Sequence, residues 1–118
     1  YKPKEFSQKK IKKDNKEINI KFEKTIDILN ELGKHKKNQF LVGFALENDN
    51  EIINAKTKLK NKNLDLIVLN SLNDKGAGFG YDTNKVSLIN KSGEIVTFDL
   101  KEKSMVALDI FNYIIKTI

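Results

Sequence analysis

The chain has 118 residues, of which 39% are hydrophobic and 32% charged, so it can build a core and is not a disordered chain. It has no cysteine and one histidine, His35, which excludes disulfides and a cysteine nucleophile and disfavours a histidine-based metal site. All 22 basic residues are lysine and the net charge is +6, which suits phosphate ligands but equally describes a solvated basic surface.

The amino-terminal residues predict a flap followed by a strand. Residues 1–16 are polar and rich in lysine, which favours an extended loop or flap. Residues 17–22 alternate between polar and apolar side chains, which predicts a half-buried strand. Its buried face would consist of Ile18, Ile20 and Phe22.

A short helix and a buried strand come next. Residues 25–33 have the composition of a helix that Thr25 or Asp27 caps and Gly33 ends. Residues 39–45 form a continuous apolar run of strand length, which is typical of a strand covered on both faces.

The second half of the chain predicts a helix, three strands and a terminal helix. Residues 51–61 predict a helix and residues 64–69 a second buried strand. Residues 85–90 and 94–100 alternate around a short turn and predict an antiparallel hairpin. Residues 105–118 have a broad apolar face, so we expect a helix that packs on the sheet.

Together these elements predict an α/β fold. Two buried strands joined by a helix should be parallel, with a right-handed crossover. We expect a Rossmann-like, three-layer mixed sheet with a parallel β-α-β core, an antiparallel carboxyl-terminal hairpin and a terminal helix. It would be one domain, 1–118, with residues 1–16 as flap and 17–118 as core. No apolar run approaches the roughly 20 residues of a membrane span, so we expect a cytoplasmic protein with no membrane partner.

Four lysines on the predicted helix 51–61 and just after it separate into two rows. At about 100° per residue, Lys58 and Lys62 share one flank, and Lys56 and Lys60 share the other. Like charges one turn apart repel, so a bound polyanion would relieve that repulsion. A surface helix whose lysines extend around a buried apolar stripe explains the same spacing.

Two further candidates lie at the carboxyl ends of the buried strands, where open α/β sheets bind ligands. Phe44 could stack on a base there, or it could be ordinary core. Asn70 follows the second strand and is a further candidate. The basic run 9–13 is either a solvated tail or a cationic flap. The glycines in residues 76–80 open no helix, so they do not predict a dinucleotide-binding loop.

Several short motifs occur in one order along the chain. They are Lys10-Ile-Lys-Lys13, Ile26-Asp-Ile-Leu29, Val42-Gly-Phe-Ala45 with Glu47, Ala55-x-x-Lys58-Leu-x-x-Lys62-Asn-Leu-Asp65, Asn70, Phe79-x-x-Asp82-x-Asn84 and Lys103-x-x-Val106-Ala107. In combination they closely resemble the carboxyl-terminal part of bacterial phosphopantothenoylcysteine synthetase, the ligase half of the fused coenzyme A biosynthesis flavoprotein. The resemblance covers essentially the whole chain.

That resemblance implies a ligase that joins 4'-phosphopantothenate to cysteine with CTP and a divalent ion such as Mg²⁺. The substrate carboxylate would attack the α-phosphate of CTP to give an acyl-cytidylate and pyrophosphate, and the cysteine amine would then displace CMP. The flap lysine that is associated with the acyl-cytidylate falls on Lys10. The family's nucleotide contacts fall on Lys10, Ile26, Asp27, Ile28, Leu29, Phe44, Lys58 and Lys62. FMN would belong only to a fused partner domain.

The chain also departs from the family. Ile26 stands where the family often has proline, and Leu46 where it has alanine. The glycine-rich amino-terminal half of the domain is absent, so we expect a fragment of a larger domain that does not catalyse alone, and a homodimer. The alternatives are a non-enzymatic basic nucleic-acid-binding module and a dimerisation domain. Nucleic acid is not the expected partner, because arginine and aromatic ladders are missing.

Overall fold

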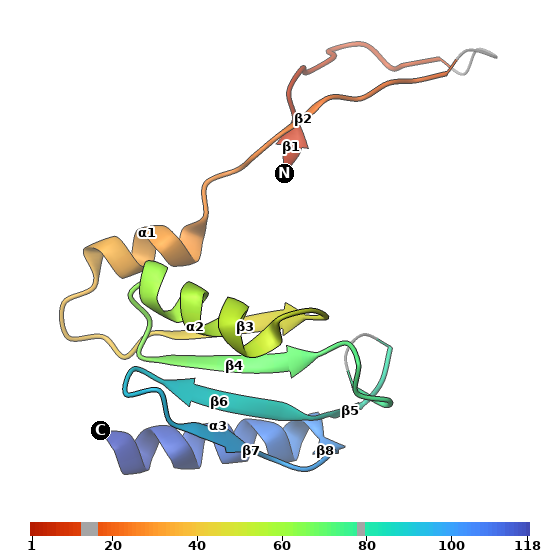
Figure 1. The fold of residues 1–118 in the computed structure, drawn as a ribbon. Coiled ribbons are helices and arrows are strands. Elements are labelled where there is room, and N and C mark those ends of the chain that lie inside the picture. Colours follow the sequence, from red (N-terminus) through yellow and green to blue (C-terminus); the bar gives the residue numbers. More distant parts are fainter. Residues whose placement is uncertain (13–16, 78–79) are drawn as a thin grey trace.

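The computed structural model describes residues 1–12, 17–77 and 80–118, and the chain forms a body and an arm (Figure 1). The body holds every element from α1 (Ile28–His35) to α3 (Lys103–Thr117). The arm, residues 1–12 and 17–27, extends away from the body. Lys13 of the predicted flap, and Gly78 and Phe79 of the glycine-rich loop, lie outside the described residues.

The arm is held by a short pairing between its two strands. β1 (Lys2–Pro3) pairs antiparallel with β2 (Phe22–Glu23). The strand predicted over residues 17–22 is therefore observed only as β2, and the prediction of a half-buried face is wrong. Its apolar side chains are exposed because no sheet face among the described residues covers them (Ile18 56%, Ile20 55%, Phe22 59%).

The body contains the predicted mixed sheet, with strand order β3-β4-β6-β7. β3 (Val42–Glu47) and β4 (Leu66–Ser71) are parallel and joined by α2 (Glu51–Asn61). β6 (Val86–Asn90) pairs antiparallel with both β4 and β7 (Ile95–Thr97). The parallel β-α-β unit and the antiparallel hairpin are thus confirmed, and α2 has the bounds predicted from the sequence. β3 lies at one edge of this sheet.

Helices cover both faces of the sheet, which gives the predicted three layers (Figure 1). Ala55 and Leu59 of α2 pack with Ile67 and Leu69 on one face, where Leu29 of α1 joins them. On the other face α3 packs against β4 and β6 (Leu66, Val68, Val86, Leu88, Val106, Ile110). Full burial of such aliphatic side chains stabilises the fold by about 1.5–3 kcal/mol each.

Three local predictions are corrected by the structure. Asp27, not Thr25, caps α1, and its Oδ1 accepts from the Asn30 N–H at 3.0 Å. Gly33 lies inside α1 and does not end it. β3 is not covered on both faces, because Phe44 is 72% exposed.

The terminal helix is preceded by a second small sheet. β5 (Thr83–Asn84) pairs antiparallel with β8 (Lys101–Glu102), directly before α3. α3 buries Val106 and Ile110 against the sheet, as the predicted packing requires. Its apolar face is broader than the sheet can cover, so that Phe111 and Ile115 stay exposed.

Candidate functional site

The two lysine rows of α2 have different surroundings. The Lys62 ammonium pairs with Asp27 Oδ2 at 2.8 Å, and Lys58 pairs with Glu47 Oε1. Within the described parts of the chain, no ion pair involves Lys56 or Lys60, and both are exposed. The row of Lys58 and Lys62 therefore faces α1 and the end of β3, while the other row faces solvent.

The predicted nucleotide segment 26–29 forms the entry to α1, next to Lys62. Ile26 and Ile28 are exposed, whereas Leu29 packs into the core beneath α1. Asp27 is held from two sides. The hydrogen bond from Lys62 and the capping hydrogen bond from Asn30 lower the pKa of Asp27 below its ordinary value. Asp27 is thus an anion at neutral pH, bonded to a cation that the resemblance assigns to a nucleotide.

A glycine lets α1 approach β3 at this point. A Cβ atom on Gly43 would lie 2.5 Å from Leu64 Cδ1 and 3.1 Å from Leu29 Cδ2, both closer than ordinary contact. Leu64 and Leu29 therefore pack close to the backbone of β3 at a position where residue 43 has no side chain. Gly43 belongs to the Val-Gly-Phe-Ala motif, and its role in placing segment 26–29 could not be read from its spacing.

Phe44 lies on a different side of the sheet from the lysine row. Side chains alternate along a strand, so Phe44 shares the face of Val42, which packs with the α3 side of the core. Ala45 points the other way, into the core beneath α2. Exposure of Phe44 argues against the ordinary-core interpretation, but its ring and Lys58 are separated by the edge strand β3.

Asn70 shares that α3 face and has an unusual environment. It sits in β4 opposite Leu46 of β3 and Val86 of β6. Its Oδ1 atom is buried and has no hydrogen-bond partner among the described residues. A buried carbonyl oxygen without a donor costs about 1–3 kcal/mol, which singles out Asn70 among the described side chains.

Lys10 lies in the arm and is exposed, and the arm extends away from α2 (Figure 1). The structure therefore brings together Lys58, Lys62 and segment 26–29, but it does not bring Lys10 or the Phe44 ring to them. The sequence interpretation missed Glu47 and Asp65 as partners of lysines. Both occur in the motifs above, which was the only signal available for them.

A hollow of about 500 Å³ opens beside the start of α2 and the end of β4. Its polar groups satisfy one another: Ser71 Oγ donates to Glu51 at 2.5 Å, and Lys85 pairs with Asp74 at 2.9 Å. None of the described residues that line it is a predicted site residue. The hollow is therefore not the predicted nucleotide site.

The described ranges 1–12, 17–77 and 80–118 contain no group of three or more carboxylate or histidine side chains that could hold a metal ion. They contain no helix that is long and apolar enough to cross a membrane.

Comparison with known proteins identifies the relatives of this chain. The profile of the DNA/pantothenate metabolism flavoprotein C-terminal domain matches residues 1–118. The chain is 42% identical over 112 residues to the Coenzyme A biosynthesis bifunctional protein CoaBC of Bacillus subtilis, covering 95% of this chain and 28% of that protein. It is 58% identical over 110 residues, 92% of this chain and 31% of the relative, to a protein from an unknown prokaryotic organism named Cysteine/Cysteine sulfinic acid decarboxylase.

Solved structures agree with the sequence relatives. The crystal structure of the C-terminal domain of CoaBC matches with a TM-score of 0.68 and 42% identity, over 80% of this chain and 46% of that one. The DNA/pantothenate metabolism flavoprotein from Streptococcus pneumoniae has a TM-score of 0.63 over 80% of this chain and 41% of its own, and at 19% identity it supports the fold alone. The chain thus spans about a third or less of these curated relatives and under half of these solved chains.

Proposed function

The chain belongs to the DNA/pantothenate metabolism flavoprotein C-terminal domain family, and from this premise we propose that it forms one wall of the CTP site of a phosphopantothenate–cysteine ligase in coenzyme A biosynthesis. The observation that carries the proposal is the row of Lys58 and Lys62 beside segment 26–29. Two cations one helical turn apart, next to a helix entry with exposed backbone, suit a nucleoside triphosphate.

The proposed reaction has two steps. A carboxylate oxygen of 4'-phosphopantothenate attacks the α-phosphorus of CTP, forming the acyl-cytidylate and releasing pyrophosphate. The cysteine amine then attacks the acyl carbon and expels CMP, which leaves the amide 4'-phosphopantothenoylcysteine. A triphosphate carries about four negative charges, and attack at phosphorus is assisted mainly by positioning and by cations. Lys58 and Lys62 would supply those cations by exchanging their carboxylate partners Glu47 and Asp27 for phosphate oxygens.

The remaining predicted residues have distinct proposed roles. Lys10 would act on the acyl-cytidylate once the arm closes on the bound nucleotide. Backbone groups of residues 26–29 would bind the nucleotide without needing a proline at position 26. Phe44 would contact the nucleotide base through its ring, because the residue is 72% exposed. Asn70 is proposed only as an auxiliary residue, whose buried side-chain oxygen Oδ1 would accept a hydrogen bond.

The described residues form no site that fits the divalent ion of the proposed reaction. Asp27 and Glu47 are the carboxylates nearest the lysine row, and each is already paired with a lysine. We therefore derive no step through Mg²⁺ from the described residues. Its ligands would be the triphosphate oxygens and groups elsewhere in the protein. FMN is likewise proposed only for a fused partner domain.

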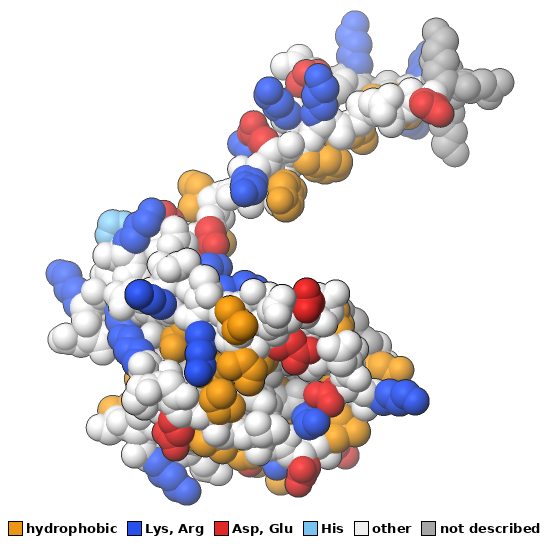
Figure 2. Space-filling view, in the orientation of Figure 1, with side chains coloured by type: hydrophobic (Ala, Val, Ile, Leu, Met, Phe, Trp, Pro, Cys, Tyr) orange, Lys and Arg blue, Asp and Glu red, His pale blue; other side chains and the backbone are white. Residues whose placement is uncertain are grey.

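Partners are proposed for the surfaces that the body leaves open. The amino-terminal half of the same domain would lie against β3, whose outer edge pairs with no other strand of the described sheet. A homodimer is supported by the arm, where hydrophobic side chains gather along one side (Figure 2). Its exposed large side chains are Tyr1, Phe6, Ile11, Ile18, Ile20 and Phe22. Such a row is costly in water and suits a second copy of the chain.

A second candidate function comes from the relative named Cysteine/Cysteine sulfinic acid decarboxylase. Under that hypothesis the protein that contains this chain would release carbon dioxide from cysteine or its sulfinic acid. Among the described residues we identify no catalytic group for a decarboxylation. The same residues include two lysines, Lys58 and Lys62, that could bind phosphate. We therefore place the ligase first.

Calorimetry with CTP and with ATP tests the ligand class. It should be carried out on these 118 residues and on the full-length natural protein that contains them. We expect the full-length protein to bind CTP more tightly than ATP. Equal affinity for both nucleotides would remove CTP from the proposal, and salt-sensitive binding to DNA without nucleotide binding would favour the nucleic-acid alternative.

A further inference from the structure

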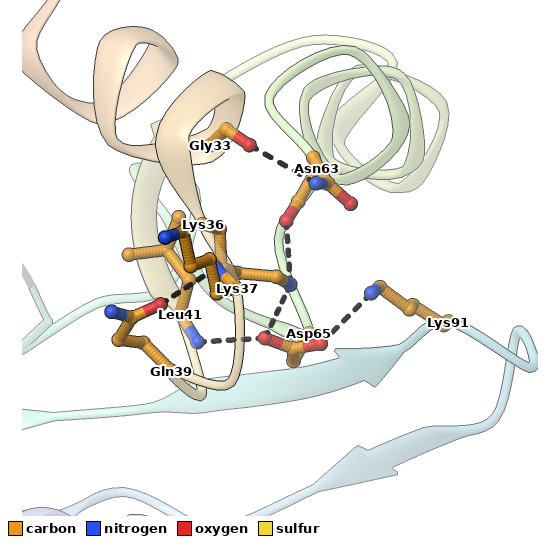
Figure 3. A network of polar contacts seen from close by, with 8 residues as sticks. All are labelled: Gly33, Lys36, Lys37, Gln39, Leu41, Asn63, Asp65 and Lys91. Carbon is orange, nitrogen blue, oxygen red and sulfur yellow. Dashed lines mark hydrogen bonds and ion pairs between the residues drawn. The ribbon is translucent and has the colours of Figure 1, made fainter.

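Hydrogen bonds among four residues join the end of α1 to the turn after α2, although the two segments are far apart in the sequence (Figure 3). We call this group the α1 anchor. It consists of Gly33, Lys36, Asn63 and Asp65. Gly33 and Lys36 belong to the last turn of α1 and its cap, and Asn63 and Asp65 follow α2.

A close backbone approach forms the first part of the anchor. A Cβ atom on Gly33 would lie 1.9 Å from the carbonyl oxygen of Lys62, so residue 33 must be glycine for the two helices to meet as they do. Asn63 adopts a left-handed conformation, with φ of 50°. Its Nδ2 atom donates to the Gly33 carbonyl at 3.0 Å.

A buried lysine forms the second part. The Lys36 side chain is only 9% exposed. Its ammonium donates to the Asn63 carbonyl at 2.9 Å and to Asp65 Oδ2 at 2.7 Å. The same Oδ2 accepts from the Leu41 N–H at 2.7 Å. Lys36 therefore links the cap of α1 to two residues that follow α2.

Lys62 connects the anchor to the candidate site. Its carbonyl oxygen touches Gly33 near the end of α1, and its ammonium pairs with Asp27 at the start of the same helix. α1 has eight residues and is therefore only about 12 Å long. We expect a displacement of its anchored end to reach its start over this short distance.

We propose that Gly33, Lys36, Asn63 and Asp65 are positioning residues that set the distance between segment 26–29 and the Lys62 ammonium, and thereby tune the binding of a nucleoside triphosphate. This inference rests on the proposed function for its ligand. The claim that these four residues place Asp27 next to Lys62 does not depend on the proposed function. None of the four residues needs to touch the nucleotide.

Asn63→Gly is the sharpest variant. Glycine keeps the left-handed backbone at no cost, so the change removes the hydrogen bond to Gly33 without straining the turn. Gly33→Ala tests the same junction by pushing the helices apart. Lys91→Met is the matched control, because Lys91 pairs with the other oxygen of Asp65, at 2.8 Å, from the β6–β7 turn, and among the described residues it donates no hydrogen bond to Gly33 or Asn63.

Steady-state kinetics of the full-length protein provides the first readout. We expect Asn63→Gly to raise KM for CTP about tenfold, the equivalent of 1.4 kcal/mol, with kcat and KM for cysteine within about twofold of wild type. Lys91→Met should leave KM for CTP within about twofold. A wild-type KM for CTP in both Asn63→Gly and Gly33→Ala would overturn the inference.

A second readout separates this inference from the proposed function. In the Asn63→Gly protein, carboxyl NMR should show the pKa of Asp27 returning toward its ordinary value, because Lys62 has moved away. An unchanged pKa of Asp27 would overturn the positioning role even if the wild type uses no CTP. Conversely, a changed pKa of Asp27 in a protein without CTP-dependent activity would contradict the proposed function but support the positioning role of the α1 anchor.

Discussion

Lys62 and Asp27 form an ion pair of 2.8 Å that joins the end of α2 to the cap of α1. The cation that we assign to the triphosphate is therefore already paired with a carboxylate. Lys58 has the same arrangement with Glu47. A phosphate must displace both carboxylates, so these pairs are expected to hold the lysines in place and to weaken anion binding at the same time.

Asp27→Asn should tighten CTP binding by about threefold, which is the size expected for removing one exposed ion pair. Asparagine keeps an oxygen that can cap α1, so the helix should stay intact. Calorimetry measures the affinity. Asp27→Ala is the control, since it also removes the cap of α1 and should lower the stability of the body as well. Weaker CTP binding by Asp27→Asn would mean that the carboxylate itself binds the ligand.

The two lysine rows should differ in their effect on CTP. Replacing both Lys58 and Lys62 by methionine should weaken CTP binding by at least about 10-fold, since a single hydrogen bond to a charged group contributes about 1.5–3 kcal/mol. The double change at Lys56 and Lys60 removes the same net charge from the same helix. It should change the affinity by less than about twofold. Equal losses of CTP affinity in the two double variants would show that only the net charge of the helix matters.

Gly43→Ala should destabilise the body, because the new Cβ would press on Leu64 and Leu29. Overpacking of this kind costs about 1–3 kcal/mol, measured as the free energy of unfolding in urea. Gly93→Asn is the control, because a Cβ at Gly93 meets nothing within 4 Å and asparagine tolerates its positive φ. Similar losses at the two sites would contradict the close approach of α1 to β3.

Asp65 should make stability depend on pH in the acid range. Burial by itself would raise its pKa, but hydrogen bonds from Leu41, Lys36 and Lys91 outweigh burial and lower the pKa to about 2. Because the folded pKa lies below the unfolded value, the stabilisation is present above about pH 4 and is lost as pH falls toward 2. Urea unfolding should lose about 1 kcal/mol over that window. In Asp65→Asn this part of the pH dependence should vanish.

Lys10→Gln in the full-length protein should stall the reaction after nucleotide transfer. Without the flap cation, the acyl-cytidylate should accumulate while pyrophosphate is still released. Mass spectrometry of quenched reactions measures the intermediate. Normal turnover by this variant would remove Lys10 from the mechanism.

The sequence predicted the β-α-β unit, the hairpin and the layer order because each depends on local patterns. The bounds of α2 follow from its own residues, and the two lysine rows follow from helical geometry. The prediction of a half-buried strand over residues 17–22 was wrong. Alternating apolar side chains indicate that one face of a strand needs cover, but they do not show which part of the protein covers it. In this chain Ile18, Ile20 and Phe22 have no such cover among the described residues.

The α1 anchor could not be predicted from the sequence. Its contacts join residues about 30 positions apart, such as Lys36 with Asp65, and they depend on a close approach at Gly33 that no local pattern encodes. The sequence predicted that Gly33 ends the helix, whereas in the structure it allows α1 to approach the end of α2. The prediction that Phe44 lies near the carboxyl end of its strand was wrong, because β3 runs over Val42–Glu47 and Phe44 lies in its first half.

The most direct test supplies the full-length natural protein with 4'-phosphopantothenate, cysteine, Mg²⁺ and CTP, and follows CMP and pyrophosphate. We expect one CMP and one pyrophosphate for each 4'-phosphopantothenoylcysteine formed, with loss of activity in the Lys58 and Lys62 double variant. Formation of carbon dioxide from cysteine or its sulfinic acid, without CMP and without need of CTP, would contradict this expectation.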